Sequence, residues 1–356
     1  MNDELYIRRC IELAGCAEGK TSPNPMVGSV IVRDGRVIGE GYHHKAGEPH
    51  AEVNAVNSVA DKSLLKESTL YVNLEPCCHW GKTPPCADLI ISMGIPRVVV
   101  GMIDPFAAVC GEGIKRMKDA GIDVTTGILE EECRELNCNF ITYHTLKRPH
   151  ITLKWAQTVD GYLDNDRSPE IPPAWMTGPV CRTFVHRMRS TCDAIMAGTN
   201  TIGRDNPSLT VRDWNGKTPI RIVLDRSLRL SPDRKVFNSE ARTLLFTDVV
   251  LTEQAAALHA GKEIIGINFS RDVLTQVMNN LYRKNIQSVM VEGGAAIFKS
   301  LIDEGLWDET SVFISPIRLA DLPCGHGSGI KAPDITGTVT ERTIIDGVQY
   351  IRTKRQ

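Results

Sequence analysis

The feature that most constrains this chain is a His-x-Glu stretch that is followed by two spaced cysteines. His50 and Glu52 stand two residues apart, and Cys77 and Cys86 follow in a Pro-rich segment. One imidazole nitrogen and two thiolates make three protein ligands, the number that leaves the fourth tetrahedral position of Zn²⁺ open for water. The sequence therefore predicts that two separate segments fold against each other around one ion.

The glutamate beside these ligands indicates catalysis. Water bound to Zn²⁺ ionises near neutral pH, so hydroxide becomes available where free water would not supply it. Glu52 would lie close to the metal without binding it and would carry the proton. Zinc-dependent base deaminases use H-x-E followed by P-C-x-x-C, whereas the spacing from Cys77 to Cys86 is longer. A longer loop must then bring Cys86 back to the ion.

Two simpler interpretations of these residues stay open. A structural zinc site needs four protein ligands, and either Cys78 or His79 could supply the fourth. Alternatively, Cys77 and Cys86 are buried thiols and no metal is bound. We favour the catalytic interpretation because the three ligands are accompanied by a glutamate that is not needed as a ligand.

The length and net charge of the chain limit the classes of protein to which it can belong. A chain of 356 residues exceeds one small core, so two domains are expected. The net charge of −2 differs from the strongly basic balance of a nucleic-acid surface. The sequence shows neither a secretory signal nor an apolar run of membrane-spanning length. We therefore expect a cytoplasmic enzyme for a small molecule, without nucleic-acid or membrane partners.

The first half alternates helices and strands. Apolar runs predict short strands at residues 27–32, 36–42, 69–74, 97–102 and 122–126. Helical spacing and stop signals predict helices at residues 3–18, 86–93, 111–120 and 130–139, with a further helix that begins at His50. Asp34-Gly35 predicts a hairpin turn. This order predicts a three-layer α/β domain with the metal at the ends of the sheet.

The second half begins after a linker at Lys147-Arg148-Pro149. Strands are predicted at residues 151–156, 193–197, 287–292, 312–315 and 348–352, and buried-type strands at residues 220–224, 243–246 and 264–269. Glu292-Gly293-Gly294 then joins a strand to a helix, and free amides at a helix start bind phosphate. The same pattern also serves plain packing. No G-x-G-x-x-G motif is present, so no Rossmann dinucleotide site is predicted.

The first-half motifs together resemble the deaminase half of the bifunctional riboflavin-biosynthesis deaminase/reductase family, within the cytidine deaminase-like superfamily. The resemblance rests on the Pro23-Asn24-Pro25 turn, His50-Ala51-Glu52, the Leu74-Glu75-Pro76-Cys77 strand end and the Gly81-to-Cys86 return. It implies substrate contacts near the pyrimidine, ribose or phosphate at Asn24, His43, His79 and Lys82. The simpler interpretation makes these a turn residue, supporting histidines and a surface lysine. Cys78 departs from the family's usual serine and could compete for the metal.

The second half resembles the reductase domain of the same family, which has a dihydrofolate reductase-like α/β fold and uses NADPH. The resemblance implies dinucleotide contacts at Ala156, Trp175, Thr201, Asp205 and Gly294. It implies substrate contacts at Lys154, Arg189, Leu209, Arg212 and Glu292. Thr201 and Asp205 could equally be a helix cap and a turn residue. The Pro-rich loop at 169–173 departs from the family, because Pro173 stands where a hydroxyl is common.

The resemblance implies two successive reactions. A zinc-dependent deaminase at residues 1–146 would deaminate a diamino-phosphoribosylamino-pyrimidinone through zinc hydroxide. An NADPH-dependent reductase at residues 150–356 would then reduce the ribosyl side chain to ribityl. We expect a homo-oligomer. The alternatives are a single-activity zinc nucleobase deaminase with a non-catalytic C-terminal substrate-binding domain, and a zinc-stabilised binding protein without activity.

Overall fold

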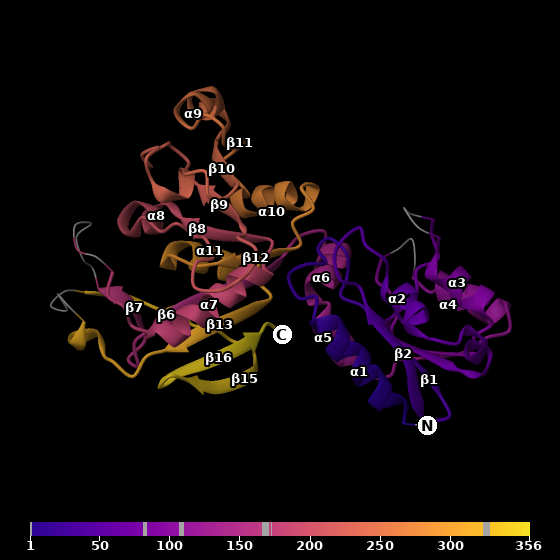
Figure 1. The fold of residues 1–356 in the computed structure, drawn as a ribbon. Coiled ribbons are helices and arrows are strands. Elements are labelled where there is room, and N and C mark those ends of the chain that lie inside the picture. The colour runs from indigo at the N-terminus through magenta and orange to yellow at the C-terminus, as the bar shows by residue number, and fades with distance from the viewer. Residues whose placement is uncertain (1, 81–83, 107–109, 166–170, 172, 323–327) are drawn as a thin grey trace. The chain divides into compact units, whose positions relative to one another are not determined.

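The computed structural model describes residues 2–80, 84–106, 110–165, 171, 173–322 and 328–356. Close packing divides the chain into two compact units, Met1–Arg148 and Pro149–Gln356, and each is described by itself (Figure 1). None of the described helices is long and apolar enough to cross a membrane.

The first unit is built on a five-stranded sheet in the order β2-β1-β3-β4-β5. The strands are β1 (Gly28–Arg33), β2 (Arg36–Tyr42), β3 (Thr69–Leu74), β4 (Arg97–Met102) and β5 (Asp123–Thr126). β1 pairs antiparallel with β2 and β3, whereas β3, β4 and β5 run parallel. Asp34 and Gly35 join β1 to β2 with φ angles of 49° and 74°, as a tight two-residue hairpin requires. The predicted hairpin is confirmed.

Helices cover both faces of this sheet. The helices are α1 (Asp3–Gly15), α2 (Ala51–Ser58), α3 (Cys86–Met93), α4 (Glu112–Asp119), α5 (Glu130–Leu136) and α6 (Cys138–Leu146), with the 3-10 helix η1 (Lys62–Glu67). Apolar residues of α1, α5 and α6 form one core with the sheet, and those of α2, α3 and α4 form another on the opposite face. The predicted three-layer arrangement is confirmed.

The C-terminal helices of this unit differ from the prediction. The sequence predicts one helix over 130–139, whereas α5 ends at Leu136 and α6 runs on to Leu146. Asn137 lies between them, and its side chain bonds the backbone of Met26 instead of facing solvent. Asparagine favours such breaks because its amide competes for backbone groups.

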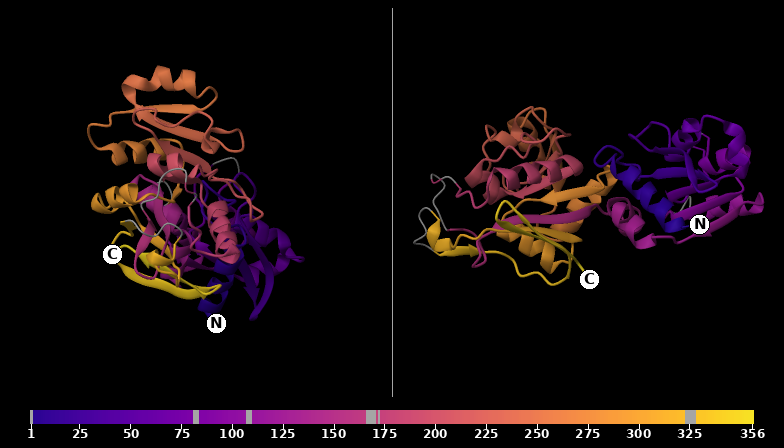
Figure 2. Two further views of the ribbon diagram at one scale, coloured as in Figure 1. Left: turned by 90° about the vertical axis from the view of Figure 1, so that its left-hand side faces the viewer. Right: turned by 60° about the horizontal axis from the view of Figure 1, so that its bottom comes forward.

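The second unit is built on a nine-stranded sheet in the order β11-β10-β9-β8-β12-β6-β13-β16-β15 (Figure 1). Figure 2 shows the same ribbon from two further sides. In this strand order, every pair of adjacent strands from β11 through β6 to β13 is parallel. β16 runs antiparallel to both adjacent strands, β13 and β15. The strands are β6 (His150–Gln157), β8 (Ala194–Gly198), β9 (Ile220–Leu224), β10 (Thr243–Asp248), β11 (Glu263–Ile267), β12 (Ser288–Val291), β13 (Glu309–Ile314), β15 (Thr338–Ile345) and β16 (Val348–Lys354).

The helices of the second unit also lie on both faces of its sheet. They are α7 (Pro179–Thr191), α8 (Thr199–Asp205), α9 (Thr252–Leu258), α10 (Val273–Arg283) and α11 (Ala295–Asp303), with 3-10 helices η2 (Lys235–Phe237), η3 (Val249–Leu251) and η4 (Leu319–Asp321). α10 and α11 pack in one core, and α7 and α8 pack on the other face. β7 (Tyr162–Asn165) pairs with β14 (Gly329–Lys331), and the sequence analysis predicts neither strand.

The central strands place three chain segments at one edge of this sheet. β8, β12 and β6 are neighbours and parallel, so their carboxyl ends meet. In open α/β sheets, ligands bind outside the carboxyl ends of the strands. The segments that follow β8 and β12, together with the end of β6, therefore form the expected ligand-binding edge.

Candidate functional site

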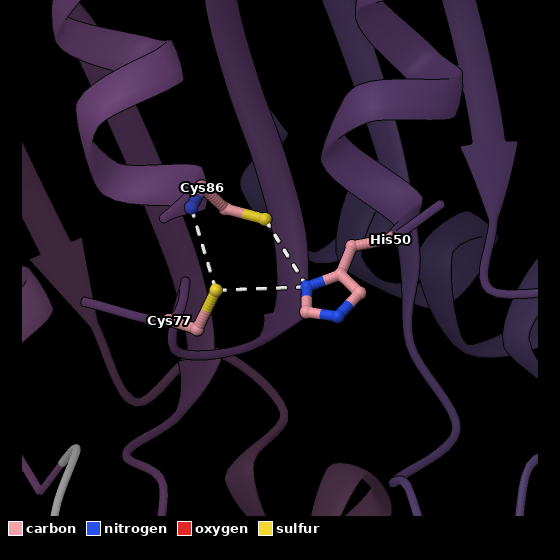
Figure 3. Close-up of side chains that lie close together, drawn as sticks. All are labelled: His50, Cys77 and Cys86. Atoms are coloured by element: carbon pink, nitrogen blue, oxygen red, sulfur yellow. Dashed lines mark hydrogen bonds between the residues drawn. The ribbon is translucent and has the colours of Figure 1, made fainter. Parts of the chain in front are cut away.

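Three side chains of the first unit converge on one point (Figure 3). His50 Nδ1 lies 3.5 Å from Cys77 Sγ and 3.3 Å from Cys86 Sγ. The three ligand atoms all lie within 4.8 Å of one another. Among the described residues, this is the group of histidine, cysteine and carboxylate side chains that could hold a metal ion.

The local fold explains why these side chains meet. His50 is the N-cap residue of α2, Cys77 follows the end of β3, and Cys86 is the first residue of α3. The Cys86 N–H donates to Cys77 Sγ at 3.4 Å, and the Ala87 N–H donates to the Cys77 carbonyl at 3.1 Å. The amides at the start of α3 thus hold Cys77 in place and favour its thiolate.

This arrangement fits zinc. A tetrahedral Zn²⁺ with Zn–S of ~2.3 Å and Zn–N of ~2.0 Å separates its nitrogen and sulfur ligands by about 3.5 Å, which agrees with the distances from His50 to the two sulfurs. The hydrogen bond with Cys86 and then that with His50 lower the pKa of Cys77 to about 4, although burial alone would raise it. Cys77 is therefore a thiolate before metal binds, as a zinc ligand requires.

Glu52 lies beside the three ligands on the first turn of α2. Its side chain is buried, and its carboxyl interacts with the Cys86 thiol. Burial, followed by the negative charge of Cys77, raises the pKa of Glu52 to about 7. A carboxyl group with a pKa near 7 can both take up and release a proton at neutral pH.

The two residues considered as a fourth ligand lie outside this group. Cys78 is buried, and burial followed by the Glu75 carboxylate raises the pKa of its thiol. His79 is exposed, and its ring meets the edge of Phe106 at a centroid distance of 6.3 Å. Neither residue belongs to the convergent set of described ligands.

Two of the expected substrate-binding residues lie in contact with each other. Asn24 Nδ2 lies 3.0 Å from His43 Nε2, and His43 Nδ1 lies 3.1 Å from the carbonyl of Pro49, the residue before His50. The His43 and His50 rings meet edge to face with centroids 5.5 Å apart. Asn24 and His43 therefore border the His50 side of the group. Lys82 lies outside the described residues.

Sequence reasoning missed Glu75, although the residue forms part of the quoted Glu-Pro-Cys motif. The Glu75 carboxylate is buried and accepts four backbone N–H groups. Its donors are Asp104 (3.2 Å), Gly111 (2.9 Å), Gly113 (3.0 Å) and Ile114 (3.3 Å). Glu75 thus binds the end of β3 to the start of α4, two residues before Cys77. The signal available in the sequence is an acidic residue that directly follows an apolar strand, two positions before a candidate ligand cysteine.

The second unit contains a pocket of about 1040 Å³ at the carboxyl ends of its central strands. It is lined by all five expected dinucleotide contacts and by two expected substrate contacts, namely Ala156, Trp175, Thr201, Asp205, Gly294, Lys154 and Glu292. Phe269, Arg229 and Arg271 also line it and were not expected. Trp175 is 71% exposed, so it does not serve as core.

Glu292 is the charged centre of this pocket. Arg189 donates to both Glu292 oxygens at 2.7 Å, and Lys154 Nζ lies 3.9 Å from Glu292 Oε2. Although burial alone would raise it, Arg189 and then Lys154 hold the pKa of Glu292 at about 2. Burial lowers the pKa of Lys154, which Glu292 partly offsets. Glu292 is therefore a fixed anion.

The remaining expected substrate contacts, Arg189, Leu209 and Arg212, are not among the residues that line this pocket. Arg189 also donates to the Thr210 carbonyl at 3.0 Å. Leu209 is buried in the core with a φ of 52°. The Arg212 N–H donates to His186 Nδ1 at 2.8 Å. Leu209 and Arg212 therefore lie on one segment of the chain, and Arg189 binds that segment through Thr210. Pro173 lines the pocket, whereas residues 166–170 and 172 of its loop lie outside the described residues.

Both halves of the chain match families of known proteins. Residues 1–102 match the cytidine and deoxycytidylate deaminase zinc-binding region, and residues 149–326 match the RibD C-terminal domain. The riboflavin biosynthesis protein RibD of Aquifex aeolicus (strain VF5) is 42% identical over 319 residues, which cover 88% of this chain and 87% of that protein. The RibD of Escherichia coli (strain K12) is 36% identical over 330 residues, covering 89% and 88%.

Solved structures agree with these matches. A diaminohydroxyphosphoribosylaminopyrimidine deaminase/5-amino-6-(5-phosphoribosylamino)uracil reductase from Thermotoga maritima has a TM-score of 0.86 to this chain at 36% identity and covers 99% of both chains. The RibD of Acinetobacter baumannii has a TM-score of 0.87 at 31% identity, again with 99% of both chains covered. The likeness therefore extends over both units.

Proposed function

The chain belongs to the family of bifunctional riboflavin-biosynthesis deaminase/reductases, and we propose how its residues divide the two reactions. The first reaction is hydrolytic deamination of 2,5-diamino-6-(5-phosphoribosylamino)pyrimidin-4(3H)-one. The second is NADPH reduction of the ribosyl side chain of 5-amino-6-(5-phosphoribosylamino)uracil to ribityl. Matches to both a deaminase and a reductase family support two activities over a single-activity deaminase.

We assign the deaminase to residues 1–146, with His50, Cys77 and Cys86 as zinc ligands. A bound ion would lower the pKa of water to near neutrality. Glu52 would take one proton from the attacking water and give it to the ring nitrogen. It would then take the remaining hydroxyl proton and give it to the departing amine, which leaves as ammonia. The convergence of the three ligands beside buried Glu52 is the observation that supports this assignment most strongly.

The substrate would be held by residues around His50. Asn24 can donate to and accept from the amide edge of the pyrimidinone ring. His43, which contacts Asn24, would keep that side chain in orientation. We assign His79 and Lys82 to the ribose or phosphate side, where lysine can meet a phosphate as a point charge.

We assign the reductase to residues 150–356, in the pocket at the end of the nine-stranded sheet. NADPH supplies the hydride when bound. Ala156, Trp175, Thr201, Asp205 and Gly294 would hold the dinucleotide. Lys154 and Glu292 would order the sugar hydroxyls, and Arg189, Leu209 and Arg212 would complete the substrate side. Because Arg189 already binds Glu292 through two nitrogens, Arg212 is the better candidate for the phosphate.

We further propose that the chain works in the cytoplasm as a homo-oligomer. No disulfide joins any two of the ten cysteines in the described part of the chain, which suits a reducing compartment. Size-exclusion chromatography with light scattering checks the oligomeric state, and a mass of one chain would contradict it.

An ammonia-release assay tests the main proposal. We expect the purified chain to release ammonia from the diaminopyrimidinone phosphate with or without NADPH. NADPH should be oxidised only after a lag, because the reductase needs the deaminated product. NADPH oxidation without ammonia release would contradict the order, and ammonia release without any NADPH oxidation would favour the single-activity alternative.

A further inference from the structure

Two asparagine side chains form hydrogen bonds with the main chain of Met26. Asn137 Oδ1 accepts from the Met26 N–H at 2.8 Å, and Asn137 Nδ2 donates to the Met26 carbonyl at 3.0 Å. Asn73 Nδ2 donates to the same carbonyl at 3.1 Å. Both asparagines are buried, with 3% and 0% of their surface exposed. Together they satisfy both backbone groups of Met26, as a neighbouring strand would do.

The segment held in this way carries Asn24, two residues before Met26. The Pro49 carbonyl can only accept a hydrogen bond, so His43 Nδ1 carries the hydrogen that it donates there. His43 Nε2 then accepts from Asn24 Nδ2. Asn24 keeps its Oδ1 and one N–H for other partners. A single acceptor beside a single donor matches the amide edge of an oxopyrimidine ring.

The contacts form a continuous path from α6 to the candidate metal ligands. Asn137 fixes Met26, the backbone leads to Asn24, and His43 joins Asn24 to the carbonyl of Pro49. His50 follows Pro49 directly. The relative placement of the ring-binding amide and the metal therefore depends on a side chain 111 residues away from Met26.

We propose that Asn137 is a positioning residue for the deaminase, which sets the distance between Asn24 and the metal ligands. The inference rests on the proposed role of Asn24 in binding the pyrimidinone ring. Asn137 lies beyond residues 1–102, which match the deaminase zinc-binding region. The segment containing α5 and α6 thus completes the substrate site and does more than cover the sheet.

Steady-state kinetics of Asn137→Ala test this role. If Asn24 binds the ring equally in the ground and transition states, KM for the diaminopyrimidinone phosphate rises about tenfold while kcat changes by less than about twofold. Zinc per chain should stay at the wild-type level, because no ligand is altered. NADPH oxidation with the deaminated intermediate should also be unchanged, since that pocket lies in the second unit.

Three further variants separate positioning from loss of stability. Asn137→Asp keeps the side-chain volume and the acceptor for Met26 N–H but loses the donor, so KM should still rise. Tyr71→Phe removes a 2.9 Å hydrogen bond to Asp3 elsewhere in the same unit and should leave KM unchanged. In a Glu52→Gln background, calorimetry should show that Asn137→Ala weakens binding of the same substrate by the same factor.

The outcomes are distinct. Wild-type KM in folded Asn137→Ala and Asn137→Asp would overturn the positioning role, as would a KM increase that accompanies zinc loss. An equal KM increase in Tyr71→Phe would also overturn it, because general destabilisation would then explain the effect. A wild-type chain that releases no ammonia would contradict the proposed deaminase itself.

Discussion

Two buried glutamates of this chain have pKa values displaced in opposite directions. Burial and the Cys77 charge raise the pKa of Glu52 to about 7 in the metal-free protein. Against its burial, Arg189 and Lys154 lower the pKa of Glu292 to about 2. The same type of side chain can therefore exchange a proton near neutral pH in one site, whereas it is a permanent anion in the other. Such divergence between environments is what separates acid/base groups from binding groups.

Replacement of Glu52 tests the proton-carrier role. Glu52→Gln keeps the size of the side chain but removes the base, so ammonia release should fall by about 100-fold or more. Zinc content should stay unchanged, because Glu52 is not a ligand. Elemental analysis and the ammonia assay measure both quantities. Glu48→Gln, at an exposed position nearby, is the control. Near-wild-type turnover in fully metallated Glu52→Gln would exclude this role.

Replacement of Glu292 tests whether its carboxylate stays ionised in the folded protein. Glu292→Gln leaves Arg189 buried without its carboxylate, which should destabilise the fold by about 3–5 kcal/mol at pH 7. A lowered folded-state pKa contributes stability that is complete above the ordinary value of 4.5 and is lost as pH falls towards about 2. Denaturant unfolding at pH 7 and pH 3 should therefore show a smaller difference between wild type and variant at pH 3. An equal difference at both pH values would contradict the ionised state.

At the scale of elements, single side chains hold the segments that carry site residues by accepting hydrogen bonds from backbone N–H groups. Glu75 joins the end of β3 to the start of α4 through four amides. His186 on α7 accepts from the backbone of Arg212 and Asp213. Neither residue is expected to touch substrate. Glu75 lies two residues before the candidate zinc ligand Cys77, and His186 binds the backbone of Arg212, an expected substrate contact.

The contact between β3 and α4 should affect metal affinity. Glu75→Gln replaces an acceptor oxygen with a donor that faces backbone N–H groups, so Cys77 should lose its fixed position. We expect zinc affinity to fall by about 10-fold, as for other residues that orient ligands. Chelator competition with the purified chain measures it. Asp225→Asn is the control, since Asp225 accepts two amides in the second unit. Unchanged zinc affinity in Glu75→Gln would reject the positioning role.

The contact between α7 and Arg212 should depend on pH. Burial, followed by the charges of Arg189 and Arg212, lowers the pKa of His186 to about 4. Its neutral form therefore contributes stability above the ordinary value of 6.5, and this contribution is lost as pH falls towards 4. His186→Asn retains an acceptor without a titrating ring. The thermal unfolding midpoint should fall less between pH 6.5 and pH 4 in this variant, and identical slopes would contradict the assignment.

At the scale of the whole molecule, periodic and local sequence signals predict the position of several strands well. Strands 69–74, 97–102 and 220–224 have the predicted bounds, because each is an apolar run between clear stop signals. Contacts between distant segments were not predictable. β7 pairs with β14 across more than half of the second unit, and Asn137 reaches Met26. A polar side chain that replaces a strand partner leaves no periodic signature in the sequence.

The same difference between local signals and long-range contacts explains why the sequence predicts only part of the two candidate sites. Spacing and residue type identified His50, Cys77 and Cys86, whose convergence the structure shows. The pairing of Arg189 with Glu292 was not foreseen, since both residues carry charge suited to a substrate. Arg189 lies on α7, and Glu292 directly follows β12. The buried salt bridge therefore forms only where the fold brings these two elements together.

X-ray absorption at the zinc edge of the purified chain tests the central claim most directly. The account requires three protein ligands, with Glu52 and Cys78 unbound. The spectrum should therefore fit two sulfur and two lighter scatterers per zinc, and Cys78→Ser should leave it unchanged. A fit with three sulfurs that reverts to two in Cys78→Ser would show a closed structural site and would contradict catalysis at this metal.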